Sequence, residues 1–362
     1  MSVVIMSFMG STGTAFKNTT NIAHSQDAAA TAMKYLGDSI KMAGFYGYTA
    51  DPSMIGVSAD SSMAVANDCG SSTNPPASNW AVQTTNYLMP VFGQTSTTIN
   101  GVFPCIKTSN FEQHSPLLIT RYANGHSMAY PLFGTSPAQA NGTMNSAALD
   151  SVNNPGKVFI QADPGGGILF RASQFDTIKA AGNSRSRLKK ATDIQAAYAG
   201  AAVNDPIDIS IQEFSSYVYY VRPCSNTNNA GNCSGVDTIP TLVRQELTSS
   251  GSQPTMTEVP LVEGIERVYY IFGIDTDNNG TPNIFTDSPA PADIQNIVSI
   301  KVSLLVRDIT SSSTYSDSGK TYDLSGIGLS GGLFTCSGSS CNYHRKVYSE
   351  TFQVRNSSLR RM

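Results

Sequence analysis

The run DTDNNG at positions 275–280 has residue types and a spacing that could bind a hard cation. Oxygen ligands stand at its first, third and fifth positions and a glycine at its sixth, as in a calcium-binding loop. Such a loop needs a carboxylate at its twelfth position, where Thr286 stands, and an acidic residue follows one position later. The alternative is a hairpin turn that uses Asx and Gly chemistry. The possible Ca²⁺ ligands are Asp275, Asp277, Asn279 and Asp287.

No other group of residues indicates a catalytic centre. Gly326–Gly331 spells G-x-G-x-x-G, but the sequence around it does not predict the strand–helix–strand unit that a dinucleotide site requires. No G-x-S-x-G or H-E-x-x-H motif is present. The histidines are far apart in the sequence: His24, His114, His126 and His344. We therefore predict that the protein is not an enzyme.

Six cysteines predict disulfide bonds. Two pairs each bracket a short polar loop, which leaves a third pair by elimination, although six cysteines also allow other connectivities. Free or zinc-bound thiols are the alternative, but the sequence has no C-x-x-C motif. Disulfides would place the chain in an oxidising compartment. The pairs predicted from proximity are Cys69–Cys105, Cys224–Cys233 and Cys336–Cys341.

The composition narrows the class of protein. Charged residues make up 14% of the 362 residues, against about 25% in typical globular proteins. The net charge of −3 gives no reason to expect nucleic acid or an anionic membrane surface as a partner. Low charge and sixteen tyrosines favour a β-rich exported protein over a cytosolic α/β enzyme.

One amphipathic helix is predicted near the N-terminus, most clearly over Ile22–Gly44. Its apolar residues recur at steps of three, four and seven, which keeps them on one face. Gly44 is a suitable C-terminal stop, because a glycine adopts the left-handed conformation without a Cβ penalty. We expect this stripe to divide its area between the chain's own sheet and neighbouring subunits. The interface residues predicted from it are Ile22, Ala29, Met33, Leu36 and Ile40.

Strand patterns occupy much of the remaining chain. The best is 296–307, where five β-branched or leucine residues alternate on one face. The stretch 259–273 alternates around a bend at Glu263 and Gly264, and 117–122 is expected to end at an Asn124–Gly125 turn. One helix followed by many strands predicts an α+β fold in which a long N-terminal helix packs on a mostly antiparallel, β-rich head.

The order of several segments in the second half resembles the type IV pilus assembly protein family PilW. The C-terminal pair Tyr343–Tyr348 and Phe352–Asn356 is similar to the family's closing arginine–asparagine strand, and Met42–Gly47 is similar to the segment where the family's helix leaves its stalk. The other segments that carry the resemblance are Tyr217–Arg222 (YVYYVR), Ile239–Arg244 (IPTLVR), Leu261–Glu266 (LVEGIE), Gly273–Gly280 (GIDTDNNG) and Val298–Arg307 (VSIKVSLLVR).

The resemblance implies a minor pilin, which helps to prime a type IV pilus from the inner membrane and lies at or near the tip. It implies other minor pilins and the major pilin as partners, possibly with a large tip adhesin, and a location in the periplasm and in the extracellular pilus. Pilins begin with a basic leader and an apolar segment. None precedes Val3, so we expect the stalk to be truncated here and the inner membrane to be reached through a missing N-terminal segment.

We therefore expect residues 1–44 to form a truncated stalk helix and residues 45–362 a β-rich head. The head would divide into a variable, loop-rich part at 45–210 and a PilW-like antiparallel part at 211–362. Two alternatives remain open. One is a pseudopilin at the tip of a type II secretion system, and the other is a secreted β-rich adhesin or binding protein.

Overall fold

The computed structural model of the protein describes residues 2–49, 52–57, 63–70, 80–84, 87–91, 94–95, 97–128, 153–163, 166–174 and 210–356. It has one long helix, α1, and a short one, α2, together with fourteen strands. The bounds are α1 Ser2–Met42, β1 Ile55–Val57, β2 Leu88–Val91, α2 Ile99–Val102, β3 Leu117–Met128, β4 Val158–Asp163, β5 Gly166–Arg171, β6 Ser210–Arg222, β7 Thr241–Ser250, β8 Gln253–Glu263, β9 Ile265–Ile274, β10 Ile284–Thr286, β11 Ile297–Arg307, β12 Thr321–Asp323, β13 Leu333–Thr335 and β14 Arg345–Gln353.

Two larger sheets form the body. The eight-stranded sheet has the order β1-β5-β4-β6-β3-β2, with β7 beside β6 and β8 beside β7. The four-stranded sheet has the order β10-β9-β11-β14, and β12 and β13 form a small third sheet. Every pairing is antiparallel except that of β1 with β5. The described part is therefore α+β and mostly antiparallel, as predicted.

The bend predicted at Glu263 and Gly264 is the corner between the two larger sheets. Gly264 has a φ of +84°, which a residue without a Cβ adopts most easily. Its N–H donates to the Pro240 carbonyl at 2.7 Å, and its carbonyl accepts from the Arg307 N–H at 2.9 Å. One alternating stretch of sequence thus gives β8 in the eight-stranded sheet and β9 in the four-stranded sheet.

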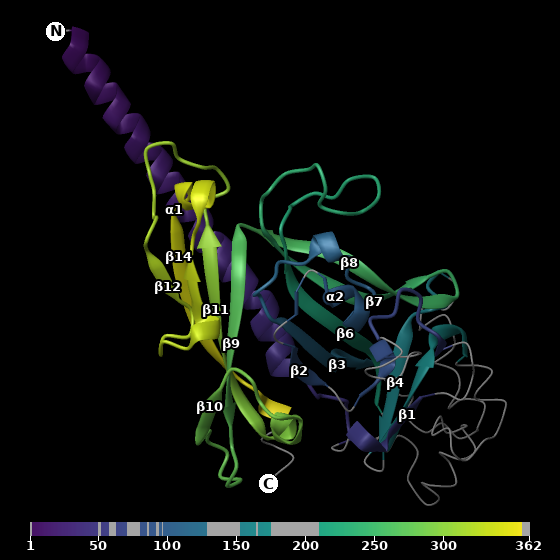
Figure 1. Ribbon diagram of the computed structural model, residues 1–362. Helices are drawn as coiled ribbons and strands as arrows, with labels where there is room; N and C mark the ends of the chain where they lie inside the picture. Colours follow the sequence, from purple (N-terminus) through teal and green to yellow (C-terminus); the bar gives the residue numbers. More distant parts are fainter. Residues whose placement is uncertain are drawn as a thin grey trace, which may run out of the picture.

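Helix α1 passes between the two sheets and packs against β3, β8, β11 and β14, and its N-terminal part extends beyond the body (Figure 1). Leu36 and Ile40 are fully buried in the main core. The helix ends at Met42, two residues before Gly44, whose φ is +76°. The Asn356 side-chain amide donates to the Met42 carbonyl at 3.2 Å and the Ala43 carbonyl at 3.1 Å, so the end of the head caps the helix. No helix in the described part of the chain combines the length and apolar character of a membrane span.

Two local predictions have different outcomes. The prediction of a turn at Asn124–Gly125 is wrong, because β3 continues through both residues to Met128. Asn124 is paired with Glu213 of β6, so the long neighbouring strand outweighs the turn preference of the Asn-Gly pair. The structure contains the three predicted disulfides, Cys69–Cys105, Cys224–Cys233 and Cys336–Cys341.

Candidate assembly interface

The two sides of α1 have different surroundings. From Ala29 onward, one side is enclosed by the chain's own sheets, and its residues are buried: Ala29, Ala32, Met33, Leu36, Ile40 and Ala43. The other side carries exposed residues, among them Ala30, Lys34 and Asp38. This division follows the period of the apolar stripe, because residues three or four apart share a helix face.

Four of the five predicted interface residues are buried within the chain itself. Ala29, Met33, Leu36 and Ile40 are at most 6% exposed, whereas Ile22 is 54% exposed. The sheets therefore cover most of the stripe that we expected to be shared with neighbouring subunits. The surface of α1 that is open to a partner is Ile22, near the point where the helix leaves the body, together with the face opposite the stripe.

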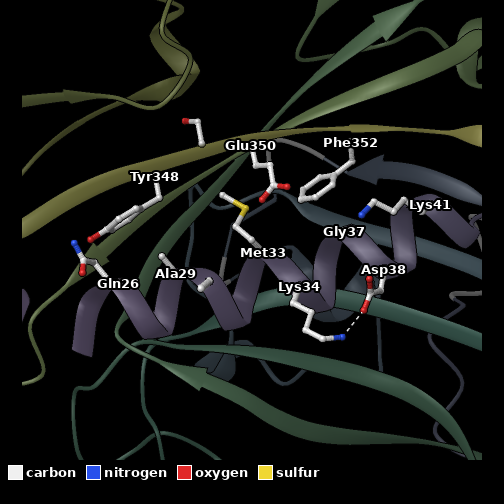
Figure 2. Close-up of a pocket in the computed structure, with 12 residues that line it drawn as sticks. Gln26, Ala29, Met33, Lys34, Gly37, Asp38, Lys41, Tyr348, Glu350 and Phe352 are labelled. Carbon is white, nitrogen blue, oxygen red and sulfur yellow. Dashed lines mark hydrogen bonds and ion pairs between the residues drawn. The ribbon is translucent and has the colours of Figure 1, made fainter. Parts of the chain in front are cut away.

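A groove of about 450 Å³ runs between that open face and β14. Figure 2 shows that the side chains of Tyr348, Glu350 and Phe352 point from the strand toward the helix. They alternate with residues that point the other way, as expected for a strand. The residues that line the groove are Gln26, Ala29, Ala30, Met33, Lys34, Gly37, Asp38, Lys41, Tyr348, Ser349, Glu350 and Phe352.

Gly37 and Phe352 bring the helix and the strand close together. A Cβ on Gly37 would lie 2.4 Å from a carbon of the Phe352 ring, closer than van der Waals contact allows. The Lys41 ammonium lies 5.3 Å from the centroid of the same ring, within the range of a cation–π interaction. A helix-interior glycine costs stability, and here the space that it leaves is filled by an aromatic ring.

The rim of the groove is polar. Lys34 and Asp38 form an exposed ion pair at 2.8 Å, one helical turn apart, and the hydrogen bond to Asp38 raises the pKa of Lys34. Exposed pairs of this kind contribute little to stability. The groove therefore combines apolar lining residues, such as Ala29, Met33 and Phe352, with a charged rim.

A second, smaller pocket of about 240 Å³ lies where α1 leaves the body. The Asn21 amide donates to the Asp308 carboxylate at 3.0 Å, and the hydroxyls of Ser25 and Tyr348 are 3.4 Å apart. Burial raises the pKa of Asp308, against the opposing effects of His344 and of the Asn21 hydrogen bond. These contacts hold α1 to the head next to the N-terminal part of the helix that extends beyond the body.

β14 is anchored at its first residue. The buried Arg345 guanidinium donates to Glu266 at 2.9 Å and to Asp317 at 3.1 Å. Breaking a buried, hydrogen-bonded ion pair leaves an uncompensated charge, which is strongly destabilising. With Asn356 bound to the end of α1 three residues after β14, the strand and the helix keep a fixed relation along the groove.

The predicted calcium loop uses its own polar groups. The Asp275 carboxylate accepts from the Gly280 N–H at 2.9 Å and from the Asn279 N–H at 3.3 Å. Burial acts to raise the pKa of Asp275, but these main-chain hydrogen bonds outweigh it and lower the pKa. Asp287 accepts from the Tyr269 hydroxyl instead. The geometry is that of the alternative hairpin turn, and calcium binding stays a prediction.

Other potential ligand or catalytic residues do not form a site in the described residues. One set of three side chains of the types that bind metals comes together, Asp317, Cys336 and Cys341. Its two cysteines form a disulfide, so they offer no thiolate. Among the histidines, the His344 ring stacks on Tyr315 at 3.6 Å, and the side chain of His126 lies outside the described residues.

The sequence interpretation missed most residues of the groove. The alternation of Tyr348, Glu350 and Phe352 was a visible signal for one face of a strand, but the pattern does not say which element that face meets. Gly37 carried no signal beyond a glycine within a helix. Asp308 and Asn356 lie far from α1 in the sequence, so only the fold brings them to it.

The strand side of the groove lies in a part of the chain that matches a known family. A family model matches residues 218–356, from within β6 through β14 to Asn356. The family is PilW, Type IV Pilus-assembly protein W. The resemblance is thereby confirmed over this part of the chain. No curated protein and no solved structure shows a significant match.

The PilW match associates the chain with type IV pilus assembly, and with the cell envelope and the other components of the pilus in general. The PilW region includes the whole four-stranded sheet and several residues that contact the C-terminal half of α1, among them Tyr219, Phe352 and Asn356. Most of the surface that α1 packs on therefore lies within the matched residues.

Proposed function

We propose that the protein is a minor pilin that primes a type IV pilus and is incorporated at or near its tip. It acts by packing and not by catalysis. Other pilins would contact the exposed part of α1, and the head would rest on the filament formed by the packed helices. The partners would be other minor pilins, the major pilin and possibly a large tip adhesin, with the inner membrane reached through an N-terminal segment.

One observation carries this proposal. The PilW match covers the sheet against which a long N-terminal helix packs, and that helix continues beyond the body into open space (Figure 1). A helix that projects from its own domain gains little stability by itself, because isolated helices depend on packing. Neighbouring helices would supply that packing.

Ile22 gives the proposal a specific contact. It is an apolar side chain, 54% exposed, next to the hydrogen bond between Asn21 and Asp308. Burying the exposed part of one isoleucine against a neighbour contributes about 1 kcal/mol to binding. A carboxylate at the same position would lose this contribution and would also have to be desolvated, which weakens binding further.

The test compares two glutamate substitutions on the same helix. Ile22→Glu should reduce the number of pili per cell at least tenfold, because it charges the proposed contact. His24→Glu is the matched control, because His24 is exposed on another side of α1. Both proteins should keep the wild-type unfolding midpoint, measured by denaturant titration of the purified chain.

Deletion of the gene separates the proposal from its alternative. Loss of pili with normal protein secretion supports the minor pilin. Loss of secretion with normal pili would instead identify a type II secretion pseudopilin. Normal pili in both the deletion strain and the Ile22→Glu strain would overturn the proposed function.

A further inference from the structure

β14 is a long edge strand whose outer side has no partner strand in the described part of the chain. The other strands at the ends of the two larger sheets are short, like β1, β2 and β10, or guarded, like β8. β8 contains Pro254 and Pro260, and Ala66 exchanges main-chain hydrogen bonds with its outer side. β14 has nine residues, no proline and an unbroken register with β11. Natural proteins usually block such an edge, because it invites pairing with another chain.

The hydrogen-bond pattern identifies the groups on the free edge. Immediately outside the strand, the Asp308 N–H donates to the His344 carbonyl at 3.0 Å, and the Val354 N–H donates to the Val298 carbonyl at 2.8 Å. In an antiparallel pair every second residue bonds to the partner strand. The even-numbered residues of β14 therefore bond to β11. The residues whose N–H and C=O groups point outward are Arg345, Val347, Ser349, Thr351 and Gln353.

The groove provides room beside this edge. The side chains of Tyr348, Glu350 and Phe352 lie on its strand side (Figure 2). On the helix side the groove is lined in part by Ala30, a small and exposed residue. The four-stranded sheet thus stops one strand short of covering α1, and a fifth strand about 4.8 Å from β14 would place alternate side chains over this side of the helix.

We propose that β14 accepts an extended segment of a different polypeptide as the fifth strand of its sheet. A row of outward main-chain donors and acceptors selects a polypeptide backbone over a small molecule, and the groove selects its side chains. Small or apolar residues would face Ala30. Glu350 has no ion-pair partner among the described residues, so a basic residue of the incoming strand would lie opposite it.

A different polypeptide fits the edge better than a second copy does. Two β14 edges related by a two-fold axis would pair antiparallel, and the two α1 helices would then point in opposite directions. In the proposed function, the helices of neighbouring subunits pack side by side in one direction, and the antiparallel arrangement conflicts with this. The choice against a second copy therefore rests on the proposed function. The incoming strand is therefore assigned to another subunit of the same assembly.

The experiment places a photo-cross-linking amino acid at Gln353, an exposed residue at the end of β14, in the full chain in the native bacterium, so that Glu350 is kept. The adduct and the partner segment in it are identified by mass spectrometry. Thr351→Pro removes one outward N–H without touching the ladder to β11, and Thr351→Val is the matched control. We expect the proline variant to reduce the adduct about tenfold, as the loss of one hydrogen bond and a steric clash together predict, and the valine variant to change it less than twofold.

A second measurement covers the case in which the proline variant does not fold. A synthetic peptide of the cross-linked segment is added to the wild-type chain, and hydrogen exchange of β14 is followed. The amides of Val347, Ser349 and Thr351 should exchange at least tenfold more slowly with the peptide, while those of Tyr348 and Glu350 should not change.

Three results would overturn the inference: an adduct with a second copy only, no adduct with any protein, or an adduct that withstands Thr351→Pro in a folded chain. These outcomes are distinct from failure of the proposed function. Normal pili in the deletion strain together with the expected adduct would reject only the pilus role. Loss of pili without an adduct would reject only strand addition.

Discussion

On the side of α1 that the sheets enclose, Leu36 and Ile40 are fully buried, whereas on the side that borders the groove, Ala30 and Lys34 are exposed. Both sides belong to the same turns of one helix. The enclosed side has large aliphatic residues that fill the core. The open side has small and charged residues that leave room beside β14. The difference indicates that one side holds the chain together and the other is available to a partner.

The largest effect should come from charging the enclosed side. Leu36→Asp buries an unpaired carboxylate in the core, and we expect it to lower the free energy of unfolding by more than about 4 kcal/mol, enough to prevent folding. Lys34→Ala, two residues away on the open side, should change the free energy by less than about 0.5 kcal/mol. Denaturant titration of the purified chains measures both. A Leu36→Asp protein as stable as the wild type would contradict the difference in burial between the two sides of α1.

Gly37 tests the boundary between the two sides. Gly37→Ala should cost about 1–3 kcal/mol, because the new Cβ would meet the Phe352 ring at 2.4 Å. In a Phe352→Ala background the same substitution should be neutral or stabilising by up to about 1 kcal/mol, because alanine is the better helix former. A double-mutant cycle gives the coupling. If Gly37→Ala lowers the free energy of unfolding equally in both backgrounds, the clash with the Phe352 ring is not the cause of the loss.

The smallest effect concerns pH at the point where α1 leaves the body. Burial raises the pKa of Asp308, so the folded state binds its proton more tightly than the unfolded state does. This contribution to stability is complete below the unfolded pKa of about 3.9 and is lost as the pH rises through the folded pKa. Asp308→Asn removes the titration.

We therefore expect the stability of Asp308→Asn relative to the wild type to increase by a few tenths of a kcal/mol between pH 3.5 and pH 7, since His344 and the Asn21 hydrogen bond oppose the effect of burial on the pKa of Asp308. Unfolding curves at the two pH values measure this change. A relative stability that falls as the pH rises would contradict the stated direction.

Local patterns in the sequence predicted those helices and strands whose formation depends mainly on their own residues. The three-and-four spacing from Ile22 to Ala43 predicted the helix and its buried face, and period-two alternation predicted β11 within one residue of its bounds. The bend at Glu263 and Gly264 was predicted from the alternation on either side of it, and Gly264 adopts a positive φ there. The cysteine pairs at 224 and 233 and at 336 and 341 were suggested by proximity, since short polar loops bring their ends together.

Other features depended on partners distant in the sequence. The Asn124–Gly125 turn preference was overridden because β6 pairs with β3 up to Asn124 and again at Met128, with a register shift between them. The buried stripe on α1 did not reveal whether sheets or neighbouring helices would cover it, since burial has the same sequence pattern in either case. The groove was not predicted, because its two sides lie some 300 residues apart.

The sequence by itself determined that this protein has one amphipathic helix, many strands and the segments of a PilW region, because periodicity and turn chemistry are local properties. The tertiary structure alone decided that α1 lies between two sheets, that Gly37 admits Phe352, and that β14 is the last strand of its sheet among the described residues. These outcomes depend on which surfaces meet in three dimensions. The side-chain pattern of a strand does not show whether its main-chain edge is paired, so the sequence could not predict an edge strand.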